Sequence, residues 1–120
     1  MSLKIEINAA IASHSMWKSR LQTAIKSGVL DVPVSTIAKD DQCPFGKWLA
    51  SVDVSIQDST EYKHVRELHA KFHLAAANVA ELALAGKKSE AEEQMGGNGE
   101  YSAITTKLVM ELMAWEKKVP

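Results

Sequence analysis

Glycines and prolines divide this chain into long stretches with helical periodicity, and they leave no pair of segments that could form a sheet. The 120 residues include six glycines and three prolines. One uninterrupted stretch runs from about Lys4 to Ser27 and stops at Gly28, a residue suited to the left-handed position after a helix. A second stretch follows the capping residues Asp58, Ser59 and Thr60 and stops at Gly86. Both stretches are predicted to be long helices.

Apolar residues recur with a helical period along these stretches and along the last third of the chain. A further helix, with Ser89 as its expected cap, meets Gly96-Gly97-Asn98-Gly99, where three glycines each cost about 0.8–1 kcal/mol relative to alanine. We expect a kink or a break there, with helix resuming from Glu100. The last segment then continues the apolar stripe with Tyr101, Ile104, Leu108, Leu112 and Trp115.

The connection between the first two long helices contains the only cysteine. Proline is favoured at the first position of a helix, so Pro44 places Cys43 at the N-cap of a short helix that ends near Ala50. At most one helical turn fits around 35–39, and we expect 52–58 to be an extended loop. The sequence therefore predicts an all-α fold: an antiparallel four-helix bundle, one domain over residues 1–120, with a short extra helix carrying Cys43 in the first crossover.

Charge and composition exclude several classes of partner. Fourteen basic and fifteen acidic residues give a formal net charge of −1, and no basic stripe is present that would favour nucleic acid or an anionic membrane. No apolar run approaches the 18 residues of a membrane span, and no signal peptide is expected. A single cysteine cannot form an internal disulfide, which is consistent with a reducing compartment. We expect a cytoplasmic domain.

His69 and His73 are the first indication of chemistry. They are one helical turn apart, and the apolar stripe around them contains Val65, Phe72, Ala76, Val79 and Ala83. This spacing lets one helix offer two nitrogens to one metal ion, whereas burying the same groups unpaired costs about 1–3 kcal/mol each. His14 interrupts the first apolar stripe in the same way. By contrast, His64 lies about 140° around the helix from His69, and we expect it to be solvated.

If the first and third helices are neighbours, His14 can face the same point as His69 and His73, and Cys43 can fold over that point. Three imidazoles and a thiolate are a tetrahedral donor set of the kind zinc takes. Each residue alone is more often structural, because core histidines and buried cysteines are common. The combination is far more specific.

Two other metal chemistries compete with a closed zinc site. In a zinc hydrolase, water would replace Cys43 as the fourth ligand, but here the cysteine closes the sphere, and the His pair lacks the glutamate of an H-E-x-x-H motif. A di-iron bundle of the hemerythrin type needs bridging carboxylates on the core stripes. The helices carry Glu67, Glu81 and Glu111, but these do not fall where the histidines are.

Three segments together resemble the chemoreceptor zinc-binding domain family, often called CZB. They are His14-Ser15-Met16-Trp17, Cys43-Pro44-Phe45-Gly46-Lys47-Trp48 and His69-Ala70-Lys71-Phe72-His73. The resemblance covers nearly the whole chain and implies a cytoplasmic bacterial domain that binds one zinc ion through His14, Cys43, His69 and His73. It also implies a regulatory role without catalysis, in chemotaxis or other signal transduction. The partners would be the output domain of a chemoreceptor or diguanylate cyclase and a second copy in a homodimer.

Members of this family report zinc or oxidants such as hypochlorite, and the position of Cys43 suggests how one atom could serve both signals. Its crossover is the class of element that opens at low free-energy cost, while the three histidines lie on rigid helices. A helix N-cap and a zinc ion both favour the thiolate, which is the ligand and also the species that oxidants attack. In the alternative interpretation, Cys43 is an inert structural ligand.

Overall fold

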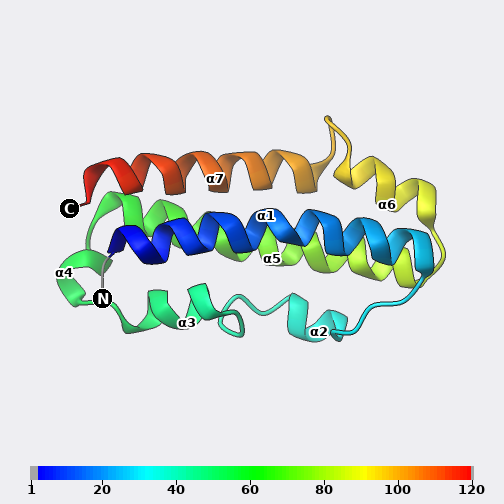
Figure 1. Ribbon diagram of the computed structural model, residues 1–120, viewed down its shortest axis with the longest axis horizontal. Coiled ribbons are helices and arrows are strands. Elements are labelled where there is room, and N and C mark those ends of the chain that lie inside the picture. Colours follow the sequence, from blue (N-terminus) through cyan, green and yellow to red (C-terminus); the bar gives the residue numbers. More distant parts are fainter. Residues whose placement is uncertain (1–2, 120) are drawn as a thin grey trace.

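The computed structural model describes residues 3–119, and all of its regular elements are helices. They are α1 (Leu3–Ser27), α2 (Val34–Ile37), α3 (Pro44–Ser51), α4 (Val54–Gln57), α5 (Thr60–Leu84), α6 (Lys88–Met95) and α7 (Glu100–Lys118). In Figure 1, α1 and α5 run in the same direction, the short helices α2 to α4 carry the chain back along one side of this pair, and α6 and α7 return along the opposite side. This up-down-up-down course confirms the predicted all-α bundle.

The core lies between the long helices. Helix α5 packs against α1 and α7, and α1 also packs against α7. The predicted stripes supply the buried side chains, among them Ile7, Leu21, Val65, Phe72, Tyr101, Leu108 and Leu112. No helix of residues 3–119 combines the length and apolarity needed to cross a bilayer.

Most predicted helix ends are confirmed. Gly28 and Gly86 follow α1 and α5 with φ of 73° and 78°, the left-handed conformation that glycine adopts without strain. At the start of α5, the Ser59 side chain accepts a hydrogen bond from the backbone N–H of Tyr62 at 3.2 Å. Of the kink or break expected at the glycine-rich segment, the structure shows a break, which separates α6 from α7.

Two local predictions are wrong. The segment 52–58 is not an extended loop, because Val54–Gln57 forms the single turn α4 and packs Ile56 against the core. Periodicity cannot distinguish a short apolar strand from a helical turn of this length. Ser89 does not cap α6, which has Lys87 at its N-cap. The Lys87 N–H donates to Leu82 O at 2.9 Å, so the closing turn of α5 fixes where α6 begins.

Candidate metal centre

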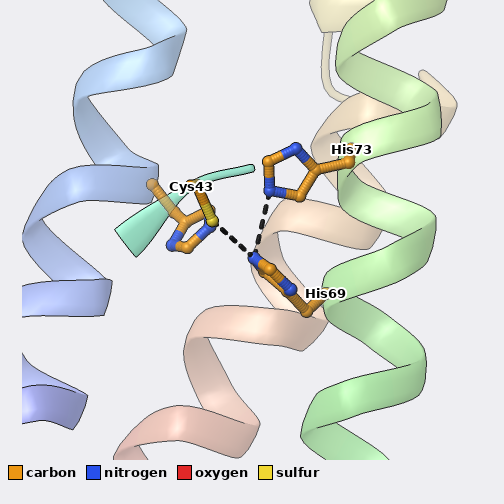
Figure 2. A group of neighbouring side chains, drawn as sticks. Cys43, His69 and His73 are labelled. Carbon is orange, nitrogen blue, oxygen red and sulfur yellow. Dashed lines mark hydrogen bonds between the residues drawn. The ribbon is translucent and has the colours of Figure 1, made fainter. Parts of the chain in front are cut away.

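The structure brings His14, Cys43, His69 and His73 together inside the bundle. One donor atom from each residue lies within 4.8 Å of the other three. The three histidines are at most 3% exposed, and Cys43 is half-buried. Figure 2 shows Cys43 approaching from the crossover while His69 and His73 project from one face of α5. Helices α1 and α5 are in contact, so the condition on which convergence of the three histidines depended is met.

Backbone carbonyls orient two of the imidazoles. His14 Nδ1 lies 2.7 Å from Ala10 O one turn earlier on α1. His73 Nδ1 lies 2.9 Å from Ile37 O at the end of α2. Because a carbonyl oxygen only accepts, each Nδ1 carries the proton, and Nε2 keeps a free lone pair for a metal. Nothing in the sequence around Ile37 indicated this supporting contact.

The spacing of the donors fits a metal better than it fits a hydrogen-bonded network. His69 Nε2 lies 3.0 Å from His73 Nε2 and 3.3 Å from Cys43 Sγ (Figure 2). His69 Nε2 can carry one proton at most, so it can donate to only one of these two partners. Zinc bonds of about 2.0–2.3 Å in a tetrahedron place donors roughly 3.3–3.8 Å apart, close to this spacing. The donor set therefore fits a zinc ion.

Burial keeps the imidazoles neutral, which is the form that binds a metal. Desolvation lowers the pKa of His14 to about 4, with a smaller lowering from His73, although the bond to Ala10 opposes both. The pKa of His69 falls to about 2, first through desolvation and then through His73 and His14. Desolvation also lowers the pKa of His73, against the bond to Ile37. At neutral pH, three uncharged imidazoles therefore surround this point.

A tight turn holds Cys43 at the N-cap of α3. Its sulfur accepts a hydrogen bond from Gly46 N–H at 3.3 Å, and Pro44 occupies the first turn as predicted. Gly46 is required here, because a Cβ at this position would lie 1.7 Å from Asp40 O. Burial nevertheless raises the pKa of the Cys43 thiol, and the opposing contribution from Gly46 N–H is smaller. The N-cap hydrogen bond is therefore outweighed by burial, and a bound metal ion would supply the positive charge that favours the thiolate.

Aromatic rings pack against the imidazoles of the cluster. The ring of His14 packs edge-on against Phe72 at 4.9 Å and against Phe45 at 5.8 Å between centroids. Phe45 also lies 5.1 Å from the ring of His69 and stacks on Trp48. These phenylalanines were not among the predicted site residues, although Phe45 sits inside the cysteine motif and Phe72 between the paired histidines. An apolar shell of this kind strengthens the interaction between a cation and its ligands.

The remaining histidine and the acidic residues lie outside this cluster. His64 is exposed as predicted, with Nδ1 4.0 Å from an oxygen of Glu111 on α7. Glu67 pairs with Lys71 on the surface, and Glu81 is exposed. Within residues 3–119, the one group of side chains close enough to hold a metal contains no carboxylate. This arrangement does not support a di-iron centre.

A helical bundle with three buried histidines and one cysteine converging on a point is a metal-binding module. A model of the chemoreceptor zinc-binding domain (CZB) family matches residues 14–80, more than half of the chain. The chain therefore belongs to the chemoreceptor zinc-binding domain family. Neither a curated protein nor a solved structure matches it. The family and the donor set fit one zinc ion per chain.

Proposed function

We propose that this chain is a regulatory zinc-binding sensor module of a bacterial signalling protein, with no catalytic activity of its own. His14, Cys43, His69 and His73 would hold one zinc ion, within a single domain that spans residues 1–120. The observation that carries the proposal is the convergence of the four donor atoms within 4.8 Å, inside a family of zinc-binding domains. Zinc would supply a fixed positive charge that stabilises the Cys43 thiolate.

The four residues connect three separate parts of the fold. His14 belongs to α1, Cys43 to the crossover, and His69 and His73 to α5. The histidines hold their positions through regular helix packing and the bonds to Ala10 and Ile37. The crossover is instead attached through short helices, so the Cys43 turn is the part of the site that separates at the lowest free-energy cost.

Oxidation of Cys43 would release this link. The thiolate sulfur attacks one oxygen of hydrogen peroxide, so that an S–O bond forms, the O–O bond breaks, hydroxide leaves, and sulfur is oxidised by two electrons. The resulting sulfenic acid is a poorer metal ligand than the thiolate. Helix α1 begins and α7 ends at the same end of the bundle (Figure 1), so a shift of α1 could reach an output domain attached there. The module would respond to zinc, to oxidants such as hypochlorite, or to both.

The runner-up function is a zinc hydrolase with a water in place of Cys43. The sulfur argues against it, since Sγ lies 3.3 Å from His69 Nε2 and occupies the position that a water would need. Metal analysis combined with an esterase assay separates the two functions. One zinc per chain without turnover supports the sensor, whereas zinc-dependent turnover that survives Cys43→Ala would support the hydrolase.

Alanine variants of the histidines test the proposed ligands. His14→Ala, His69→Ala and His73→Ala should each lower zinc affinity strongly, because each removes one of four donors. The matched control is His64→Ala, which changes an exposed histidine on the same helix as His69 and His73 and should retain zinc. An equal loss of zinc in the His64 and His69 variants would contradict the assignment.

We also propose that the module is cytoplasmic, forms a homodimer and works with the output domain of a chemoreceptor or diguanylate cyclase. The support for a dimer is an exposed set of large apolar side chains on α1 and α7, with Met16 66%, Met110 63% and Met113 48% exposed. A net charge near zero does not oppose self-association. Analytical ultracentrifugation at tens of micromolar should show two chains per particle; a monomer would contradict the dimer.

A further inference from the structure

A small cavity opens onto Cys43 beside the metal cluster. Its walls come from Glu6, Ala9, Ala10 and Ser13 on α1, and from Cys43 and Phe45 at the start of α3. The volume is about 220 Å³. Since a water molecule takes up about 30 Å³ of liquid, a reagent of a few heavy atoms fits with room to reorient. Ala9, Ala10 and Ser13 leave this space open because they are small.

A second cavity beside the cluster has a different character. It has a volume of about 280 Å³, and its lining includes Asp40, Asp41, Arg66 and His69. Charged side chains of both signs line it, and Cys43 is not part of its wall. Of these two cavities, only the first has Cys43 in its wall.

Besides Cys43, one ionisable side chain lines the cavity near Cys43. It is the half-buried carboxylate of Glu6 on α1. A negative charge in the cavity wall raises the electrostatic energy of an anion that enters the cavity, but not that of a neutral molecule. The N-terminus of α3 carries a partial positive charge, which would attract an anion. However, the N–H of Gly46 in this first turn already donates a hydrogen bond to the sulfur. Small apolar walls and one carboxylate therefore favour reagents that are small and uncharged.

We propose that reagents reach Cys43 through this cavity, and that it selects small uncharged electrophiles, peroxides included, over anionic ones. The inference rests on the proposed function, since it specifies which oxidants that site would detect. The selectivity would come from α1, which is not part of the turn that carries the cysteine.

Two alkylating reagents of nearly equal size provide the test of charge. Iodoacetamide is neutral and iodoacetate is anionic. With either reagent the thiolate attacks the CH2 carbon, an S–C bond forms, the C–I bond breaks, and iodide leaves. The iodoacetamide-to-iodoacetate rate ratio is measured on the zinc-loaded full chain, by mass of the adduct at its only cysteine, and compared with that of zinc-loaded Glu6→Gln, in which the charge of the zinc ion is the same. Glu6→Gln should reduce that ratio by about fivefold. An unchanged ratio in Glu6→Gln would overturn the selectivity.

Substitutions that fill the cavity test the route. Ala9→Met and Ser13→Leu should each slow alkylation and hydrogen peroxide oxidation about tenfold or more, at unchanged zinc content. Ala12→Met is the control, because Ala12 is exposed on the same helix and does not line the cavity. If the two filled variants react as fast as Ala12→Met, or if wild-type Cys43 is not alkylated at all, the proposed route is wrong. If alkylation follows the cavity but oxidants change neither zinc content nor hydrogen exchange, the proposed sensor function fails while the access route stands.

Discussion

Replacing Gly46 with alanine gives the sharpest test of the turn that carries Cys43. Alanine is the better helix former by about 1 kcal/mol, and Gly46 lies in the first turn of α3, so intrinsic propensity predicts a more stable protein. The structure predicts the opposite. The added Cβ would lie 1.7 Å from Asp40 O and 2.8 Å from Asp40 C, which are backbone atoms that cannot rotate away.

The size of the effect follows from these distances. Ordinary contact with a Cβ begins at 3.4 Å, so the turn must open by about 1.7 Å at this point. Cys43 lies midway between Asp40 and Gly46 and moves with them, whereas a metal–ligand distance tolerates only about 0.2 Å. The variant should therefore lose the sulfur ligand while it keeps the three imidazoles. Zinc affinity should fall by roughly 10–100-fold, the loss that is typical when a group that orients a metal ligand is changed.

A competition titration with a zinc chelator measures this loss, and circular dichroism reports whether the helices persist. Gly97→Ala is the matched control, because a Cβ at that glycine would meet nothing within 4 Å. We expect wild-type zinc affinity in Gly97→Ala and the reduced value only in Gly46→Ala. Wild-type affinity in Gly46→Ala would refute the geometry of the Cys43 turn.

Two further predictions concern stability. Removal of zinc by a chelator should leave most of the far-ultraviolet helical signal, since the apolar core formed by α1, α5 and α7 does not depend on the metal. Loss of most of that signal would show that the fold depends on zinc. The hydroxyl of Tyr101 is buried without a hydrogen-bond partner of good geometry in the described chain, and burial raises the pKa of Tyr101 to about 12. In the unfolded chain this phenol loses its proton near pH 10, so wild type should lose stability relative to Tyr101→Phe between about pH 10 and 12, by at most about 3 kcal/mol. Thermal unfolding of both proteins at pH 8 and pH 11 measures this difference, and parallel behaviour would contradict the raised pKa.

The sequence predicted the long helices and the donor set because each rests on a local pattern. Glycine adopts the left-handed conformation that ends α1 and α5, and the apolar period shows which face of each helix is buried. Once His14, His69 and His73 fall on those buried faces, packing of α1 against α5 brings them close together. Cys43 could be placed near them because it lies on the connection between their two helices, and Pro44 fixed its N-cap position at the start of α3.

The features that the sequence did not predict depend on how the crossover folds back over α5. The bond between His73 and Ile37 joins residues 36 positions apart, and no local pattern marks it. The single turn α4 gains its apolar contacts only from tertiary packing. Cys43 is the most instructive case, because its N-cap position suggested a thiolate, yet burial raises the pKa of its thiol. Desolvation depends on everything packed around the sulfur, and so the sequence pattern could not reveal it.

The most direct test of the account is X-ray absorption at the zinc edge, with metal content measured on the same sample. We predict one zinc per chain, with three nitrogen neighbours at about 2.0–2.1 Å and one sulfur at about 2.3 Å. Cys43→Ala should remove the sulfur shell alone and leave the imidazole scattering. A zinc site with only nitrogen and oxygen neighbours in the wild-type protein, or a second metal ion per chain, would contradict the central claim that these three histidines and this cysteine hold one zinc ion.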